Sequence, residues 1–127
     1  MGKFPPQPPT PHAHPLFNTR PAPHNPPGLD MFEFTIPARD GYPIRIRAYQ
    51  RSQQDPESLP LFIYFHGGGF VTGGLESDDK ALRRVARELP IVVLSVEYRL
   101  APECPFPVGF EDGEDVVKWM SLCPMGS

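Results

Sequence analysis

The chain has little cysteine, no concentrated basic charge and no long apolar run. Each absence excludes one class of protein or partner. Its 127 residues include two cysteines, Cys104 and Cys123, which are too few for a disulfide framework. We therefore expect two reduced thiols, as in an intracellular protein. The formal net charge is −3 and no basic cluster is present, so neither nucleic acid nor an anionic membrane surface is an expected partner.

Signals for secretion or membrane anchoring are also missing. The apolar runs are far shorter than the roughly 20 residues that cross a bilayer, so no transmembrane segment is predicted. The N-terminus lacks the apolar stretch of a secretory signal, and Pro6 stands where a myristoylation signal has Ser or Thr. These absences predict a cytoplasmic protein.

Proline, in contrast, is abundant, with ten of the nineteen prolines before Gly28. Proline excludes helix and ladder pairing, so we predict a disordered, partly polyproline-II tail over 1–28 and a folded unit over 29–127. Lys3, Pro6 and Pro9 match the spacing of an SH3-type ligand, although proline-rich tails also reach this spacing by chance. No acidic or thiol ligand accompanies the tail histidines, so no metal site is predicted there.

The folded unit begins with two stretches in which apolar residues alternate. They cover 32–36 and 44–48, and the turn dipeptide Asp40-Gly41 lies between them. A period of two is typical of half-buried strands, so the pattern predicts a β-hairpin. The polar stretch from Gln50 to Pro60 is predicted to be a loop.

Two apolar runs and the helical pattern between them predict a β-α-β unit. The runs are Leu61–Phe65 and Ile91–Val96, and their composition is typical of parallel strands buried on both faces. The helix places one apolar stripe toward the sheet and ends before Pro90. The residues of this stripe are Leu82, Val85, Ala86 and Leu89.

A second helix is predicted from about Pro107 to a residue before Pro124. Pro107 suits a first helical turn, and acidic residues crowd the beginning, where the helix dipole favours them. Phe110, Gly113, Val117 and Met120 are predicted to share its apolar face.

The most informative residues are His66-Gly67-Gly68-Gly69-Phe70, directly after the Leu61–Phe65 strand. Three glycines at the end of a strand expose bare backbone N–H groups, and this pattern is typical of oxyanion loops in acyl transfer. An ordinary turn is the simpler alternative. A dinucleotide loop is disfavoured, because Thr72 occupies the position of the last glycine in G-x-G-x-x-G and no G-K-[ST] follows.

With this loop and the run from Ser95 to Pro107 (SVEYRLAPECPFP), the chain resembles the hormone-sensitive-lipase-like esterases, the α/β-hydrolase fold-3 family. An acidic helix ending in Lys118-Trp119 also fits that family. The resemblance covers roughly 31–122 and implies the α/β fold class, as an incomplete α/β-hydrolase fold. It also implies carboxylic-ester hydrolysis of small acyl esters by Ser-based acyl transfer, with no cofactor and no metal.

The resemblance assigns roles to particular residues. The amides of Gly68 and Gly69 would form the oxyanion hole, Gly67 would allow the approach turn, and Phe70 would line the acyl pocket. His66 would orient the loop, and the alternative role of general base is disfavoured. The remaining loop support would come from Tyr98, Arg99 and Glu103. Cys104, Gly109 and Gly113 depart from the family's usual residues at positions that affect packing.

No catalytic triad is encoded in these 127 residues. No serine lies in a G-x-S-x-G pattern, and no histidine follows His66. We therefore expect an inactive N-terminal portion of an esterase whose Leu61–Phe65 strand has an unpaired outer edge, and which is marginally stable. The alternative is a non-catalytic product that acts as a scaffold and docks through its proline-rich tail.

Overall fold

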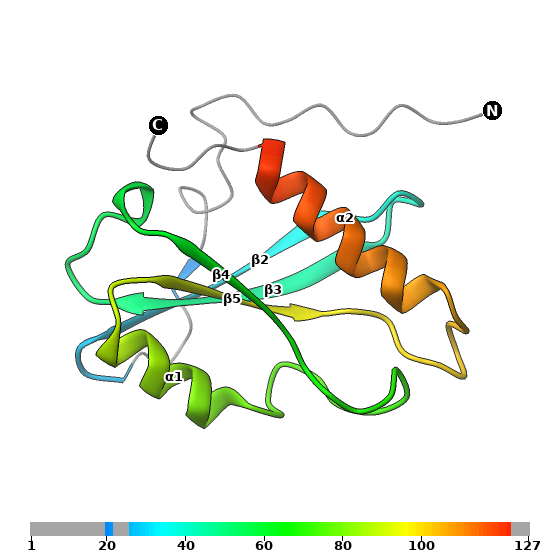
Figure 1. The fold of residues 1–127 in the computed structure, drawn as a ribbon, viewed down its shortest axis with the longest axis horizontal. Coiled ribbons are helices and arrows are strands. Elements are labelled where there is room, and N and C mark those ends of the chain that lie inside the picture. The colour runs from blue at the N-terminus through cyan, green and yellow to red at the C-terminus, as the bar shows by residue number, and fades with distance from the viewer. Residues whose placement is uncertain (1–19, 22–25, 123–127) are drawn as a thin grey trace.

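The computed structural model describes residues 20–21 and 26–122 (Figure 1). These residues form a mixed five-stranded sheet with two α-helices and one short 3-10 helix, η3. The elements are β1 (Arg20–Pro21), β2 (Leu29–Pro37), β3 (Pro43–Arg51), η3 (Pro56–Ser58), β4 (Leu61–Phe65), α1 (Asp79–Glu88), β5 (Val92–Glu97) and α2 (Val108–Leu122).

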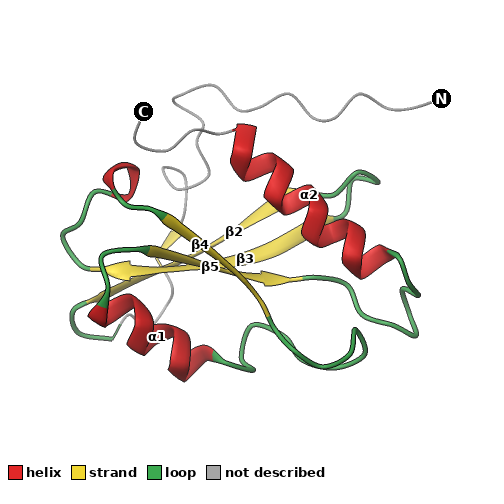
Figure 2. Cartoon of the chain, viewed as in Figure 1, coloured by secondary structure: helices red, strands yellow, loops and turns green. Residues whose placement is uncertain are grey.

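The strand order in the sheet is β1-β2-β3-β5-β4. All neighbouring strands are antiparallel except β4 and β5, which are parallel. Helices α1 and α2 lie on opposite faces of the sheet (Figure 2). Each helix covers its own hydrophobic cluster, with Leu82 and Ala86 of α1 in one and Val116 and Met120 of α2 in the other.

The predicted hairpin is confirmed as β2 and β3. Ile36 pairs with Ile44 across the turn, and both side chains are fully buried. Gly41 takes a φ of 90° and donates its amide to the Ala38 carbonyl at 2.8 Å, which closes the turn. β3 continues to Arg51 and η3 interrupts the predicted loop, so the polar stretch is more ordered than its composition indicates.

The predicted β-α-β unit is also confirmed. β4 and β5 are parallel, with Leu61 opposite Val92. Helix α1 buries Leu82 and Ala86, but Leu89 is its C-cap and is 49% exposed. The apolar stripe therefore ends one turn earlier than predicted, because the chain is already extended at Leu89.

The prediction that β4 is buried on both faces is wrong. β4 is the last strand in the sheet, and Phe62 and Phe65 are 47% and 40% exposed, whereas every side chain of Val92–Val96 is buried. The reason is the position of the helices, since α1 packs over β2, β3 and β5 and α2 packs against β2. A uniformly apolar run therefore identifies the strand but not its burial.

Helix α2 forms where it is predicted, but its buried face is rotated. Phe110 and Val117 are 55% and 43% exposed, which contradicts the predicted apolar face. The cause is Asp112, which is fully buried and binds Arg99 beneath the helix. A polar residue that turns inward for an ion pair is not visible to a pattern of hydrophobicity. The residues that α2 buries are Gly109, Asp112, Val116 and Met120.

The N-terminal segment is described only in part. Arg20–Pro21 form β1 and pair with Phe32 and Glu33 of β2, which differs from the disorder predicted across residues 1–28. The SH3-type spacing from Lys3 to Pro9, the tail histidines and Cys123 lie outside the described residues. Neither α-helix in the described ranges combines the length and apolar character needed to cross a bilayer.

Candidate oxyanion site

Residues 66–73 leave the carboxyl end of β4 in a tight turn that glycine permits. Gly68, Gly69 and Gly73 have φ angles of 130°, 64° and 100°. A Cβ atom at Gly68 would overlap the Thr72 carbonyl oxygen, so only glycine fits there. Phe70 follows at a φ of 65°, an unusual value for a bulky residue. The turn is therefore a specific backbone conformation that costs energy to hold.

This conformation leaves neighbouring amides without acceptors. Among the described residues, the N–H groups of Gly67, Gly68 and Gly69 donate to no carbonyl or side chain. The amides of Val71 and Thr72, in contrast, both donate to the Gly68 carbonyl at 3.2 Å. Adjacent N–H groups that are fixed and unpaired form an arrangement suited to an anion or a developing oxyanion.

A cleft of about 710 Å³ opens beside these amides. Gly67, Gly69 and Phe70 line it from the loop, whereas Gly68 is not among the lining residues. One predicted oxyanion donor, Gly69, is therefore placed at the cleft, and so is the predicted acyl-pocket residue Phe70. The remaining walls are mostly apolar and come from Phe65, His66, Tyr98 and one face of α2, which contributes Gly109, Phe110, Gly113, Glu114, Val117 and Lys118.

Tyr98 connects the loop to the end of β5. Its hydroxyl donates to the His66 carbonyl at 2.6 Å, and its ring stacks on the imidazole of His66 with centroids 4.3 Å apart. Burial raises the pKa of the Tyr98 hydroxyl, so the hydroxyl stays protonated and remains a donor. The amide of Ala101 adds a second tie by donating to the Phe70 carbonyl at 2.8 Å.

His66 is a buried ring that faces the loop. It is 3% exposed, and its Nδ1 lies 2.8 Å from the Gly67 carbonyl oxygen, so this nitrogen carries the proton that is donated. Its Nε2 is buried without a partner among the described residues. This geometry suits a side chain that orients the loop.

Arg99 does not contact the loop through its side chain. Its guanidinium donates to Asp112 at 2.8 and 3.0 Å and to Asp40 at 2.7 and 3.0 Å. It therefore joins the end of β5 to α2 and to the hairpin turn. The hydrogen bond with Asp112 contributes most to raising the pKa of Arg99, and Arg99 in turn lowers the pKa of Asp40.

Glu103, the other predicted loop support, lies apart from the network. Its side chain is exposed and makes no hydrogen bond or ion pair within the described part of the chain. Of the three predicted supports, only Tyr98 contacts the loop through its side chain; Arg99 binds α2 and the hairpin turn, and Glu103 remains in solvent.

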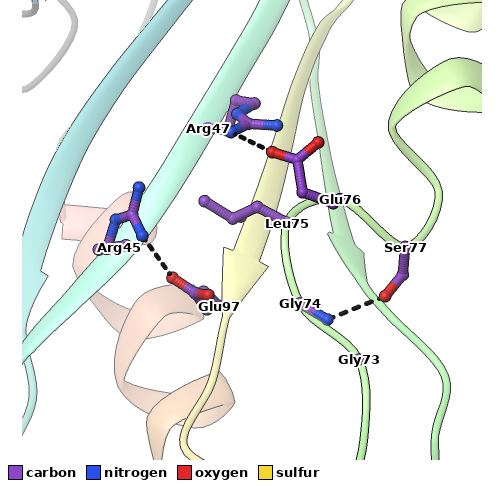
Figure 3. A pocket seen from close by; sticks show the side chains of 8 residues that line it. All are labelled: Arg45, Arg47, Gly73, Gly74, Leu75, Glu76, Ser77 and Glu97. Atoms are coloured by element: carbon purple, nitrogen blue, oxygen red, sulfur yellow. Dashed lines mark hydrogen bonds and ion pairs between the residues drawn. The ribbon is translucent and has the colours of Figure 1, made fainter.

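A second cavity, of about 430 Å³, lies on the α1 side of the sheet (Figure 3). Its arginines are already ion-paired, with Arg45 at 3.3 Å from Glu97 and Arg47 at 2.8 Å from Glu76. The amide of Gly74 is also occupied, because it donates to Ser77. We interpret the ion pairs around this cavity as structural, because the Arg47–Glu76 pair holds the segment that follows the loop against β3.

Neither a serine nucleophile nor a metal cluster accompanies the cleft in residues 20–21 and 26–122. No serine lines it, and Ser95, on the neighbouring strand β5, is 1% exposed. Within the same ranges, no group of three His, Cys, Asp or Glu side chains could hold a metal ion. The arrangement can therefore stabilise negative charge, but within the described residues it does not provide an attacking serine.

Sequence reasoning missed two residues that shape the site. Asp112 was one of several acidic residues at the start of α2, and its only signal was its position one turn before Val116 on the buried stripe. Gly73 was not singled out, yet a Cβ atom there would overlap the His66 ring and approach the Gly67 carbonyl oxygen to 2.8 Å.

Comparison with known proteins shows that this chain is similar to esterases. A family model described as alpha/beta hydrolase fold matches residues 62–122. The ethyl acetate hydrolase of Pseudomonas putida is 35% identical over 89 residues, which are 69% of this chain and 28% of that protein. Esterase LipI of Mycobacterium tuberculosis is 38% identical over 96 residues, which are 75% of this chain and 30% of that protein.

A solved structure gives the same result for the fold. The hyperthermophilic esterase from the archaeon Pyrobaculum calidifontis superposes with a TM-score of 0.65 at 48% identity. The match covers 72% of this chain and 28% of that one. The chain thus spans less than a third of the length of these relatives.

Proposed function

Because this chain belongs to the α/β-hydrolase fold family of hormone-sensitive-lipase-like esterases, we propose that it supplies the oxyanion loop of a carboxylic-ester hydrolase. The observation that carries the proposal is the set of unpartnered amides from Gly67 to Gly69 at the carboxyl end of β4. Family membership supports the reaction class, and these amides support the role of this chain, which is to stabilise the oxyanion.

The chemistry follows from where negative charge develops. In Ser-based acyl transfer, a serine hydroxyl attacks the ester carbonyl carbon, and the carbonyl oxygen takes up the electron pair. The amides of Gly68 and Gly69 donate to that oxygen, while Phe70 and the apolar wall of the cleft contact the acyl group. Collapse of the intermediate expels the alcohol, and water then releases the acid.

The described residues lack the serine that begins this sequence, so we propose that the chain alone is inactive. One oxyanion donor is worth about 2.7–4 kcal/mol in the transition state. Loss of the nucleophile lowers kcat by on the order of 10⁶. The amides cannot offset that loss, and we expect no labelling of the 127-residue chain by a fluorophosphonate. Stoichiometric labelling of any of its serines would contradict this.

The oxyanion role is tested in a chimera. Residues 29–122 replace the matching segment of the Pseudomonas putida hydrolase, and hydrolysis of ethyl acetate is measured. We expect an active chimera in which Gly69→Ala lowers kcat by about 10²–10³, because a side chain at this φ displaces the donating amide.

The matched control is Gly41→Ala. Gly41 also has a positive φ and open space for a Cβ atom, but it lies in the hairpin turn. We expect its kcat to stay within about twofold of the parent chimera, because the amide of Gly41 is not one of the proposed oxyanion donors. A folded chimera without activity, or equal effects of the two substitutions, would refute the assignment.

The non-catalytic scaffold is the remaining alternative. It depends on the proline spacing from Lys3 to Pro9, which lies outside the described residues. Sequencing the coding DNA beyond Ser127 distinguishes the two functions. A continuing frame with G-x-S-x-G, as the family resemblance implies, supports the hydrolase, and an immediate stop codon supports the scaffold.

A further inference from the structure

Residues 66–77 form one closed excursion of the chain between β4 and α1 (Figure 1). The chain leaves the sheet at His66 and passes back beside it at Gly73, where a Cβ atom would lie 2.4 Å from the Nδ1 atom of His66. Leu75 is 4% exposed, so the excursion also buries a side chain of its own. The shape of such a compact loop depends on what joins its two ends.

A hydrogen bond between Tyr64 and Asp78 joins the two ends. The Tyr64 hydroxyl donates to Oδ2 of Asp78 at 2.5 Å. Tyr64 lies on β4 just before the loop begins, and Asp78 is the N-cap residue of α1. The hydrogen bond to Asp78 is the main cause that raises the pKa of the Tyr64 hydroxyl, so this hydroxyl remains a donor at neutral pH. This pair, the Tyr64–Asp78 clasp, closes the loop at its base.

Asp78 takes part in the clasp in place of capping its helix. An aspartate at the N-cap position normally accepts a hydrogen bond from a backbone amide of the first helical turn. The Asp78 side chain makes no such bond, and its carboxylate binds the side chain on β4 instead. The carboxylate therefore serves the junction between β4 and α1 and not the end of the helix.

The next residue, Asp79, fixes the same end of α1 to β3. The fully buried Tyr49 donates its hydroxyl to Oδ1 of Asp79 at 2.5 Å, and Arg47 donates to the same oxygen at 3.2 Å. Because the start of α1 is held by β3, the clasp ties the loop to a fixed support and not to a free helix end.

We propose that Tyr64 is a positioning residue for the oxyanion loop, because its hydroxyl closes the loop on Asp78 and so holds the amides of Gly68 and Gly69 in place. This inference rests on the proposed function. Tyr64 is not among the residues that line the cleft, so it acts through residues 66–77. Loss of the hydroxyl should let the loop sample more conformations, which misplaces the donors in the transition state and leaves the cleft itself intact.

The kinetic test uses the chimera described above, with ethyl acetate as the substrate. We expect Tyr64→Phe to lower kcat about 3–10-fold and to leave KM within about twofold, because the oxyanion donors act on the transition state and not on the bound ester. A residue that only stabilises the fold would leave both constants of the folded enzyme unchanged. Tyr42→Phe is the matched control, since the Tyr42 hydroxyl makes no hydrogen bond within the described residues, and it should change neither constant.

Substitutions of Asp78 test the other half of the clasp. Asp78→Asn keeps a side-chain oxygen that can accept the Tyr64 hydroxyl, and we expect its kcat to stay within about twofold of the parent chimera. Asp78→Ala removes the acceptor and should lower kcat as much as Tyr64→Phe does. The variant that combines Tyr64→Phe with Asp78→Ala should be no slower than either single variant, because both remove the same bond. Losses that add in the double variant would overturn the clasp.

Hydrogen exchange in the full 127-residue chain provides a measurement that does not depend on activity. The amides of Val71 and Thr72 both donate to the Gly68 carbonyl, so their exchange reports on the turn. We expect Tyr64→Phe to speed this exchange about 3–10-fold and Tyr42→Phe to leave it unchanged. Circular dichroism of each variant shows whether it is folded. Unchanged exchange in a folded Tyr64→Phe chain would overturn the proposal.

The outcomes separate this inference from the proposed function. If Gly69→Ala lowers kcat of the chimera and Tyr64→Phe does not, the positioning role of Tyr64 fails while the oxyanion assignment stands. If Gly69→Ala has no effect in an active chimera, the oxyanion assignment fails and the positioning role fails with it.

Discussion

Gly73 is the residue whose replacement most directly tests how the loop is held. Its φ is 100°, and a Cβ atom would overlap the His66 ring and the Gly67 carbonyl oxygen. Both obstacles belong to the glycine loop at residues 66–73, and one of them is backbone that cannot move aside. At the residue scale, therefore, the shape of the loop depends on the absence of a single methyl group.

We expect Gly73→Ala to lower the free energy of unfolding more than Gly41→Ala. Both substitutions carry the cost of a side chain at positive φ, about 1–2 kcal/mol. Gly41 has open space around it, so the additional loss at Gly73 measures the overlap. Urea denaturation provides the measurement, and equal losses would show that the loop adjusts freely.

Tyr98→Phe removes one buried hydroxyl and leaves the ring that stacks on His66. The His66 carbonyl then loses its donor at 2.6 Å, and we expect a loss of about 1–3 kcal/mol in unfolding free energy. Tyr42→Phe is the control, since this ring is 42% exposed and its hydroxyl makes no hydrogen bond within the described residues. A change at Tyr98 as small as the change at Tyr42 would contradict the support role.

At the scale of elements, Arg99 links three segments that are far apart in the sequence. Asp112 of α2 binds it from a fully buried position, and Asp40 binds it from the exposed hairpin turn. The ring of Tyr42 lies 4.3 Å from the guanidinium carbon and covers it. Helix α2 and the hairpin turn together thus position the segment that follows β5. This segment includes Tyr98, which contacts the loop.

The two carboxylates should differ in their effect on stability. Asp112→Ala leaves Arg99 without its buried partner, and we expect a loss of about 3–5 kcal/mol. Asp40→Asn removes only a surface pair, and we expect a loss of about 0–1 kcal/mol. Thermal or urea unfolding of both variants makes the comparison. Equal losses would show that burial does not set the strength of this link.

The Asp40 pair also predicts a dependence on pH. Arg99 lowers the pKa of Asp40 from its ordinary value of 3.8, so the pair stabilises the fold above that value. This contribution is lost as the pH falls through the lowered pKa of the folded state. Asp40→Asn should therefore lose less stability than the wild type on acidification below pH 3.8. Glu103→Gln serves as the matched control, because its side chain is exposed and makes no ion pair among the described residues.

At the scale of the whole molecule, the position of β4 dominates. The sheet buries its central strands β3 and β5, while its last strand keeps an apolar edge beside the cleft.

The sequence by itself determined most of the elements and the family that the chain belongs to. Alternating and continuous apolar runs set the hairpin, the β-α-β unit and α2, because local periodicity is decided by residues close in the chain. The glycine triplet after β4 identified the loop for the same reason, since positive φ angles and bare amides are local properties of glycine.

Only the tertiary structure decided which face each element buries. β4 is apolar yet half exposed, because burial depends on where α1 and α2 pack and not on the strand's own composition. Asp112 turns inward because Arg99, thirteen residues away, lies beneath α2. Glu103 carries the same charge but remains in solvent. Burial and ion pairing depend on segments that the fold brings together, so a local sequence pattern does not predict them.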